Sequence, residues 1–271
     1  MSFWEEFWKI LKVTMPVPQS YGWFHLLSFA LSIAAAVVLC VLYQKGIYRN
    51  VRRVVLVTAV IVTVLEVYKQ LVFSFSWDGG LQFDYPWWSF PWQFCSMPMY
   101  VGLLAGVTKG RVHRACCAFL GSYAMFAGAC VMFYPTTVFV DLIGINVQTM
   151  FCHGSMLTVG VYLLFTRYVE LEHKTVLRAL PVFAVGVGIA IVLNELTYRL
   201  GILEFDSFNA FFISPYSEPH LPVYSLVQPY LPFVLDIAVY VGGFTLASWL
   251  VVLICMGIRA AVQSSAKTGA N

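Results

Sequence analysis

Two residues that lie far apart in the chain have the side chains needed for nucleophilic chemistry. Cys95 stands near the start of a short apolar run, two residues after Gln93, and His153 opens another apolar run directly after Cys152. A thiol is strongly nucleophilic near neutral pH when a neighbouring histidine takes its proton or stabilises the thiolate. The pairing alone leaves the question open, because any cysteine-rich membrane protein offers such pairs.

The composition places both residues in a membrane protein. The chain has 271 residues, of which 60% are hydrophobic and 11% are charged, whereas nearly a quarter of an ordinary soluble domain is charged. The net charge of +3 gives no argument for nucleic acid. Most cysteines lie inside apolar runs, which argues against a disulfide scaffold or a zinc site. We therefore expect an all-α polytopic membrane protein without a metal or other cofactor.

Seven apolar runs are candidates for membrane-spanning helices. They are expected at residues 21–43, 51–73, 91–107, 112–133, 147–165, 177–200 and 230–258. The third is the shortest, and Pro98 is expected to bend it. Residues 3–13 place aromatic side chains on one helical face and charges on the other. Residues 1–20 are therefore predicted to be an interfacial helix and a linker, ahead of a transmembrane domain at 21–258.

The distribution of Lys and Arg predicts the orientation of these spans. Loops 74–90, 134–146 and 201–229 carry no Lys or Arg, whereas most of the basic residues flank the spans on the opposite side. The bias places the N-terminus outside and the C-terminus in the cytoplasm, which requires an odd number of spans. Residues 259–271 are then a cytoplasmic tail, expected to be disordered. The membrane is taken as the cell membrane, most simply the cytoplasmic membrane of a bacterium.

Spans one to three resemble spans five to seven. The matched positions are His25 and His153, Glu66 and Glu195, Lys69 and Arg199, and Tyr-Val-Gly at 100–102 and 240–242. The same residue types recur at the same depth, which predicts two three-helix units in parallel orientation, joined by span four. Parallel repeats of this kind are found in transporters.

Polar and ionisable side chains gather in the outer halves of the spans, where they are costly and suggest a site. They predict a polar cavity open to the outside. Its candidate residues are His25, Glu66, Lys69, Asn194, Glu195, Arg199 and Asp236. The i,i+3 pair of Glu66 with Lys69 and the i,i+4 pair of Glu195 with Arg199 are equally well explained as structural ion pairs. His25 favours helix packing over catalysis, and Asp236 is expected to meet a cation across the bundle.

Three segments carry a resemblance to a known family. PWQFCSMP at 91–98, CHG at 152–154 and the long outer loop with Asn209 and Pro215 resemble the YwaF-like bacterial integral membrane proteins. That family is similar to a vertebrate transmembrane cysteine acyltransferase that remodels ether phospholipids. It is more distantly similar to the androgen-induced membrane hydrolases, which cleave lipid esters with a Thr/His pair. The resemblance covers residues 21–258.

The resemblance implies that Cys95 is the acyl-accepting nucleophile and His153 the base. Much of the family has a histidine where this chain has Gln93. A glutamine can donate a hydrogen bond to an oxyanion but cannot carry a proton, so either Gln93 or a backbone N–H at the start of the third span is expected to support the oxyanion.

Two functions from different classes follow. The first is a membrane-embedded lipid acyltransferase or acyl hydrolase, whose partners are membrane lipids. The alternative is a transporter or binding protein for a small polar solute, which would use the parallel repeat and the same cavity; a non-catalytic scaffold also stays open. A hydrogen bond between Cys95 and His153, beside a cavity open to lipid, would favour the enzyme. A central cavity on the repeat axis would favour the transporter. The sequence does not predict an oligomeric state.

Overall fold

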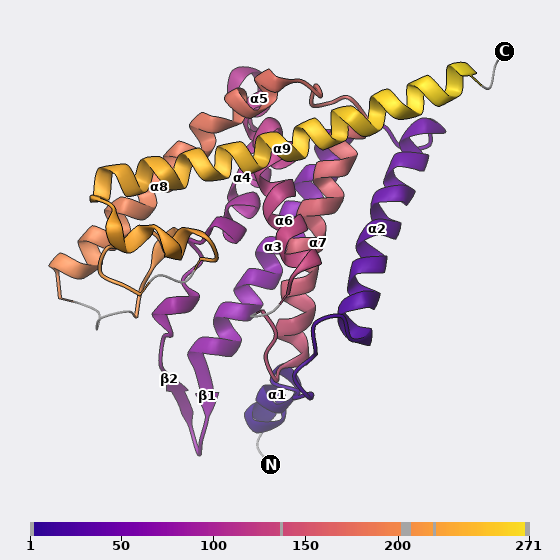
Figure 1. Ribbon diagram of the computed structural model, residues 1–271. Helices are drawn as coiled ribbons and strands as arrows, with labels where there is room; N and C mark the ends of the chain where they lie inside the picture. The colour runs from indigo at the N-terminus through magenta and orange to yellow at the C-terminus, as the bar shows by residue number, and fades with distance from the viewer. Residues whose placement is uncertain (1–2, 136–137, 202–206, 219–220, 269–271) are drawn as a thin grey trace.

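The computed structural model describes residues 3–135, 138–201, 207–218 and 221–268. Within this part of the chain, six helices are long and apolar enough to cross a membrane, and a seventh apolar helix, Phe94–Val107, is shorter (Figure 1). The predicted all-α polytopic fold is confirmed in this form, and the chain is a multi-pass membrane protein.

The long helices follow the predicted spans closely. The helices are α1 (Phe3–Leu11), α2 (Trp23–Gln44), α3 (Val51–Ser74), α4 (Met97–Val107), α5 (Gly110–Phe119), α6 (Met125–Phe133), α7 (Ile143–Phe165), α8 (His173–Arg199) and α9 (Phe233–Thr268). The strands are β1 (Phe75–Trp77) and β2 (Leu81–Phe83). Short 3-10 turns lie at Trp87–Ser89, Phe94–Ser96, Ala210–Phe212, Tyr224–Leu226 and Gln228–Tyr230.

A continuous helical segment forms the centre of the bundle. The π-helical turn Leu120–Ala124 joins α5 to α6, and all of its residues are buried. Helix α7 packs against α6, α2 and α3, while α4 lies between α3 and α5. The outer faces of α2, α3 and α9 instead expose leucine and valine side chains, such as Leu31, Val64 and Val239. In a membrane these faces contact lipid, because exposed apolar surface of this extent is stable there.

The C-terminal end of α3 continues into a small hairpin that the all-α prediction did not contain. Strands β1 and β2 are antiparallel, with Phe75 opposite Phe83, and Asp78-Gly79-Gly80 forms the turn between them. Asp-Gly is a strong hairpin signal, so the sequence carried this information. Helix α1 rests against the hairpin, where the ring of Trp8 stacks on Phe75 with centroids 6.1 Å apart.

Two local predictions are wrong. Pro98 does not bend a helix, because the chain forms the 3-10 turn Phe94–Ser96 and α4 begins at Met97. Pro98 thus lies in the first turn of α4, where its missing N–H has no intrahelical partner to lose. The tail after Arg259 is helical, since α9 continues to Thr268. Ala260, Ala261 and Gln263 favour helix, and the first glycine after them lies beyond Thr268.

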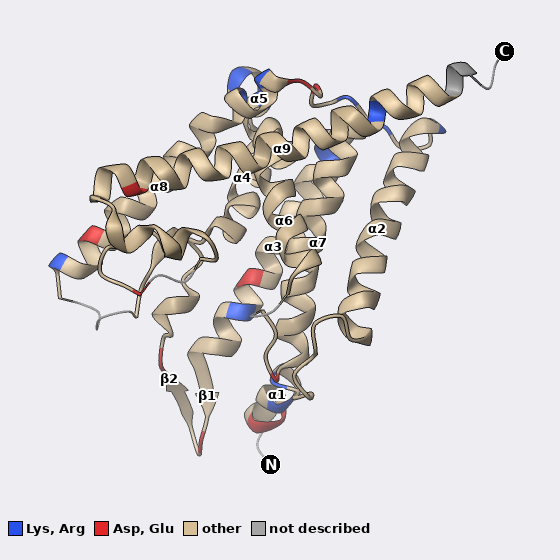
Figure 2. Cartoon of the chain, in the orientation of Figure 1, with Lys and Arg blue, Asp and Glu red and all other residues tan. Residues whose placement is uncertain are grey.

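The two ends of the bundle differ in charge. Lys and Arg residues gather where α2 ends and where α5 begins, and another lies toward the C-terminal end of α9 (Figure 2). The N-terminus lies at the other end of the bundle from the C-terminus (Figure 1). Lys9, Lys12, Lys69 and Arg199 are basic residues away from these positions.

Candidate functional site

Cys95 and Cys152 bring the two chemically interesting segments into contact. Cys95 lies in the 3-10 turn just before α4 and is half-buried. Cys152, on α7, directs its thiol at the backbone carbonyl oxygen of Cys95, with 3.8 Å between sulfur and oxygen. The start of α4 and the middle of α7 therefore meet, although 57 residues separate the two cysteines in sequence.

His153 is buried beside Cys152 and has a defined tautomer. Its Nδ1 lies 2.8 Å from the carbonyl oxygen of Thr149. Because a carbonyl oxygen accepts but does not donate, Nδ1 carries the proton and Nε2 carries a lone pair. Such an Nε2 can take a proton from a thiol. Within the described part of the chain, however, no hydrogen bond joins the Cys95 sulfur to His153.

A buried ion pair on α3 lies close to all three residues. Lys69 Nζ is 2.7 Å from a carboxylate oxygen of Glu66, so the pair predicted from their spacing is formed. Gln148, on α7 one turn before Cys152, reaches the Glu66 carboxylate with its Nε2 at 3.4 Å, and Val62, one turn before Glu66, packs with Cys152. The two thiols, the imidazole and the ion pair therefore form one cluster near the C-terminal end of α3.

Two side-chain amides complete the hydrogen bonding of the Glu66 carboxylate. Gln70 Nε2 donates to one oxygen at 2.8 Å, and Gln148 Nε2 lies 3.4 Å from the other. Gln70 also accepts from the Tyr85 hydroxyl at 2.8 Å. Burial, and after it the charge of Glu66, raises the pKa of Tyr85, which keeps the phenol protonated as a donor. The carboxylate is thus held in one position and stays compatible with burial.

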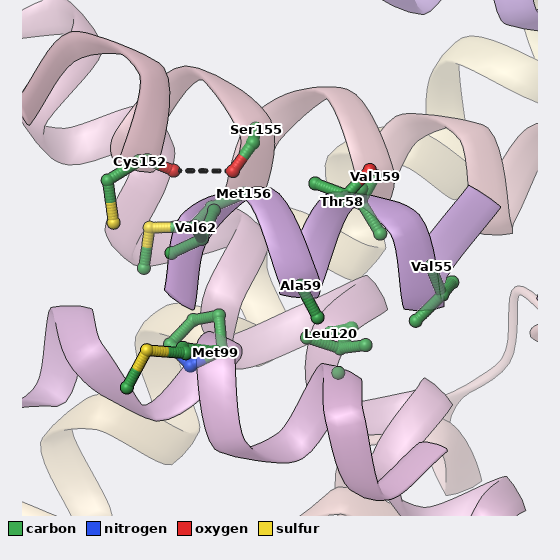
Figure 3. Close-up of a pocket in the computed structure, with 12 residues that line it drawn as sticks. Val55, Thr58, Ala59, Val62, Met99, Leu120, Cys152, Ser155, Met156 and Val159 are labelled. Atoms are coloured by element: carbon green, nitrogen blue, oxygen red, sulfur yellow. Dashed lines mark hydrogen bonds between the residues drawn. The ribbon is translucent and has the colours of Figure 1, made fainter. Parts of the chain in front are cut away.

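Two hollows border this cluster. A groove of about 470 Å³ opens between the outer part of α3, the hairpin and the start of α4. It is lined by Thr63, Glu66, Val67, Gln70, Leu71, Ser74, Phe75, Phe83, Tyr85, Pro91, Met99 and Tyr100. A narrow pocket of about 20 Å³ lies between α3, α4 and α7 and is bordered by Cys152 (Figure 3). Cys95 lies beside these hollows without lining either one.

Gln93 is used to hold the long outer loop. Its Nε2 donates to the carbonyl oxygen of Asn209, and its Oε1 accepts from the backbone N–H of Phe211, each at 2.9 Å. Asn194, on α8, binds the backbone of Ala210, which lies between Asn209 and Phe211. Its Nδ2 donates to Ala210 O at 3.1 Å, and its Oδ1 accepts from Ala210 N at 2.8 Å. Gln93 Nε2, which was a candidate donor to an oxyanion, therefore already donates to the loop in this structure.

The loop held by these amides enters the bundle. Phe211 and Ile213 are almost fully buried, and the Phe211 ring lies 6.1 Å from that of Phe94, next to Cys95. Phe211 and Phe212 have φ values of 60° and 57°, which cost energy in non-glycine residues. The described residues 207–218 therefore form a plug rather than a surface loop.

The remaining candidate cavity residues are spread over the bundle. His25 links helices, since its Nδ1 accepts from Tyr21 N at 3.0 Å and its Nε2 lies 2.9 Å from Met132 O. Glu195 and Arg199 form an exposed ion pair. The Tyr216 hydroxyl donates to Glu195 at 2.7 Å, and this hydrogen bond raises the pKa of Tyr216. Among the seven candidates, Glu66 lines the groove.

The prediction that Asp236 meets a cation across the bundle is wrong. No ion pair among the described residues includes this carboxylate, which is buried in the first turn of α9. Tyr224 lies beside it, and burial together with this carboxylate raises the pKa of the Tyr224 hydroxyl. The N-terminal end of a helix favours a carboxylate electrostatically, which accounts for its position without a cation.

A second cysteine and histidine make the contact that was predicted for Cys95. Cys117 Sγ lies 3.7 Å from His113 Nε2, one helical turn away on α5, so the i,i+4 spacing was the signal available in the sequence. His113 also contacts Tyr168 OH at 2.7 Å and Ala105 O at 2.8 Å. Cys117 is 2% exposed. His113 therefore connects a loop and two helices at the basic end of the bundle. The thiol of Cys117 is too deeply buried for a substrate to reach it.

Comparison with known proteins identifies the family. The model of the TMEM164 family matches residues 20–263. Since this match covers most of the chain, the protein belongs to the TMEM164 family, which confirms the resemblance read from residues 21–258. No curated protein and no solved structure matches the chain.

Proposed function

We propose that this member of the TMEM164 family is a membrane-embedded lipid acyltransferase or acyl hydrolase that uses Cys95 and His153. Family membership favours a lipid acyltransferase. The observation that carries the proposal is the cluster of Cys95, Cys152, His153 and the Glu66–Lys69 pair beside a groove that opens toward lipid. An ester of a membrane lipid can reach this cluster sideways, without leaving the bilayer.

The first half of the reaction moves the acyl group to sulfur. The Cys95 sulfur attacks the carbonyl carbon of the lipid ester, and His153 Nε2 takes the thiol proton. As the new carbon–sulfur bond forms and the ester bond breaks, His153 gives this proton to the leaving oxygen. In the second half, a lipid hydroxyl or water attacks the thioester, and its proton passes through His153 back to the Cys95 sulfur.

Two features of the resting structure prepare this chemistry. The Nδ1–H to Thr149 hydrogen bond leaves His153 Nε2 with its lone pair, and the contact of Cys152 Sγ with Cys95 O holds α7, which carries His153, against the turn that carries Cys95. The reaction requires the thiol and imidazole to approach further when substrate enters, because catalytic hydrogen bonds often tighten only in the substrate complex. Since Gln93 Nε2 donates to Asn209 and Ser96 N–H donates to Gln93 O at 2.9 Å, the backbone N–H groups of Phe94 and Cys95 are the better oxyanion donors.

The same proposal includes an arrangement in the membrane. We infer seven crossings, with the N-terminus and the hairpin outside and the end of α9 in the cytoplasm, because Lys and Arg gather at that end. The parallel repeat would relate α2, α3 and α4 to α7, α8 and α9 by rotation about the membrane normal. In support, α3 packs along α4 and α8 packs along α9.

Mass spectrometry of protein purified from membranes tests the chemistry. We expect an acyl group on the Cys95 peptide, released by neutral hydroxylamine as a thioester is. The peptides containing Cys152 and Cys117 serve as internal controls and should be unmodified. An acyl group on Cys152 with none on Cys95 would mean that the nucleophile is the other thiol. Absence of any adduct, together with no acyl transfer between phospholipids in reconstituted vesicles, would overturn the proposal.

A further inference from the structure

The groove and the narrow pocket are separated by one flexible side chain. Met99 lines both hollows and packs with Val62 and Cys152 in a small apolar cluster of its own, apart from the main core. Methionine is unbranched and adapts its shape readily. A change of its rotamer would therefore join the two hollows next to the two thiols.

The narrow pocket has the lining of a hydrocarbon site. Figure 3 shows it running between α3 and α7 from Cys152 and Met99 at one end to Val55 at the other. Its walls are mainly apolar: Val55, Ala59, Val62, Met99, Gly102, Leu120, Met156 and Val159. Thr58 and Ser155 are its polar side chains, and the Ser155 hydroxyl donates to Cys152 O in its own helix at 2.8 Å. A mainly apolar hollow favours apolar ligands.

The length of the pocket fits a short extended chain. Val62 and Val55 lie two turns apart on α3, which corresponds to roughly 10 Å along the helix. The closed volume of about 20 Å³ is too small for a chain, so Met99 and its neighbours must move aside for entry. Along this path α3 and α4 lie close together. A Cβ added to Gly102 would be 2.8 Å from the Ala59 Cβ.

The groove indicates where the occupant comes from. On α3, Val67 and Leu71 line the groove and are also among the exposed apolar residues, on a face that contacts lipid in a membrane. The polar residues Glu66, Gln70 and Tyr85 lie in the same groove. A molecule that enters from the bilayer and has both a polar part and hydrocarbon is a membrane lipid.

We propose that the narrow pocket binds one acyl chain of that lipid, with its carbonyl end at Cys95 and Cys152 and its methyl end toward Val55 and Val159. The groove holds the rest of the lipid, and Met99 opens the way between them. Val62 and the residues beyond it then determine which chains are accepted. This inference rests on the proposed function for the position of the carbonyl, but the chain site itself requires no catalysis.

Photo-crosslinking tests the site directly. The full-length protein in vesicles receives a phosphatidylcholine with a diazirine at the methyl end of one chain, and crosslinked residues are mapped by mass spectrometry. We expect labels on Val55, Leu120 or Val159. A second probe, with the diazirine near the carbonyl, should label Met99 or Cys152. Labels confined to exposed apolar residues such as Val60 and Val64 would overturn the inference.

A matched pair of substitutions on α3 makes the test specific. Val62 is 6% exposed and lines the pocket, whereas Val64 is 62% exposed and faces outward. Val62→Phe should reduce methyl-end labelling of the pocket by about tenfold or more, because overpacking excludes the chain. Val64→Phe should leave it unchanged. If Val62→Phe does not fold, Ser155→Leu fills the pocket from the opposite wall and should have the same effect. Unchanged pocket labelling in a folded filling variant would contradict the site.

The outcome is separable from that of the proposed function. Crosslinking is repeated in Cys95→Ala, which cannot form a thioester at this position, and the pocket labels should persist. Pocket labels without any acyl adduct on Cys95 in the native protein would support the chain site and count against the enzyme. An adduct on Cys95 without pocket labels would leave the proposed chemistry intact and reject this site.

Discussion

Asn194 satisfies both backbone hydrogen-bonding groups of Ala210 with its single amide. The Nδ2 donates to Ala210 O at 3.1 Å, while the Oδ1 accepts from Ala210 N at 2.8 Å. Gln93 forms the equivalent pair with Asn209 and Phe211. Two amides, one from α8 and one from the segment before α4, thus hold three consecutive loop residues inside the bundle beside Phe94 and Cys95.

Removing the Asn194 amide should release the plug. In Asn194→Ala, the N–H of Ala210 loses its partner in a buried position, and its C=O keeps only the long bond from Ile213 N at 3.4 Å. An unsatisfied buried group costs about 1–3 kcal/mol. We expect a lower melting temperature in detergent and faster chymotrypsin cleavage after Phe211 or Phe212. Thr197→Ala on the same helix is the control, because the Thr197 hydroxyl bonds to the carbonyls of its own helix. Equal cleavage of Asn194→Ala and the native protein would contradict the clamp.

Substitutions at Gln93 distinguish a residue that holds the loop from one that donates to the oxyanion. Gln93→Glu keeps the acceptor for Phe211 N but loses the donor to Asn209 O, and it introduces a carboxylate beside the cluster. If Gln93 acts by holding the loop, two effects should rise together in variants at this position. Chymotrypsin cleavage of the loop should become faster in proportion to the loss of acyl transfer. If a variant lost acyl transfer while its loop stayed fully protected, Gln93 would instead act on the reacting carbonyl.

The sequence predicted best the relationships that depend on local spacing. Glu66 and Lys69 lie one turn apart on one helix, so their ion pair followed from helical geometry. The bonds from Gln93 to Asn209 and Phe211 join residues more than a hundred positions apart, and no periodicity encodes them. The partner of Asp236 was missed for the same reason, because it depends on how the loop containing Tyr224 folds back onto α9.

Other differences came from signals that were present but misread. Pro98 fits the first turn of a helix as well as its interior, and the 3-10 turn before Met97 decides between them. Asp78-Gly79 indicated the hairpin. The contact between Cys152 and Cys95 brings together the two predicted segments, yet it involves the neighbour of His153 rather than the imidazole. Sequence thus predicted which segments meet, while side-chain direction required the fold.

The orientation in the membrane predicts which engineered cysteines an impermeant maleimide reaches. Ser76, in the hairpin, and Ser264, near the end of α9, are both exposed positions. From outside intact cells, Ser76→Cys should be labelled and Ser264→Cys should be labelled only after permeabilisation, because the basic flanks stay in the cytoplasm. The native protein gives the background from its own cysteines. Labelling of Ser264→Cys in intact cells would reverse the proposed orientation.

The proposed chemistry predicts how two substitutions combine. Cys95→Ala removes the nucleophile and His153→Ala removes the group that takes its proton, so each should abolish acyl transfer in reconstituted vesicles. Residues that act as one unit are strongly non-additive when removed together. The double variant should therefore be no less active than either single variant. A further loss in the double variant, beyond that of both singles, would indicate independent roles.

Cys152→Ala is the matched control, because Cys152 is adjacent to both residues but has no step in the mechanism. Its thiol bonds weakly to Cys95 O and fills space beside Met99. Replacement by alanine should preserve acyl transfer and cost at most about 1 kcal/mol of stability as a packing defect. If Cys152→Ala loses acyl transfer while Cys95→Ala keeps it, the nucleophile is Cys152, which then attacks from within the narrow pocket. If both variants stay active, and uptake of a polar solute fails in Glu66→Gln instead, the groove serves transport and the cysteines are structural.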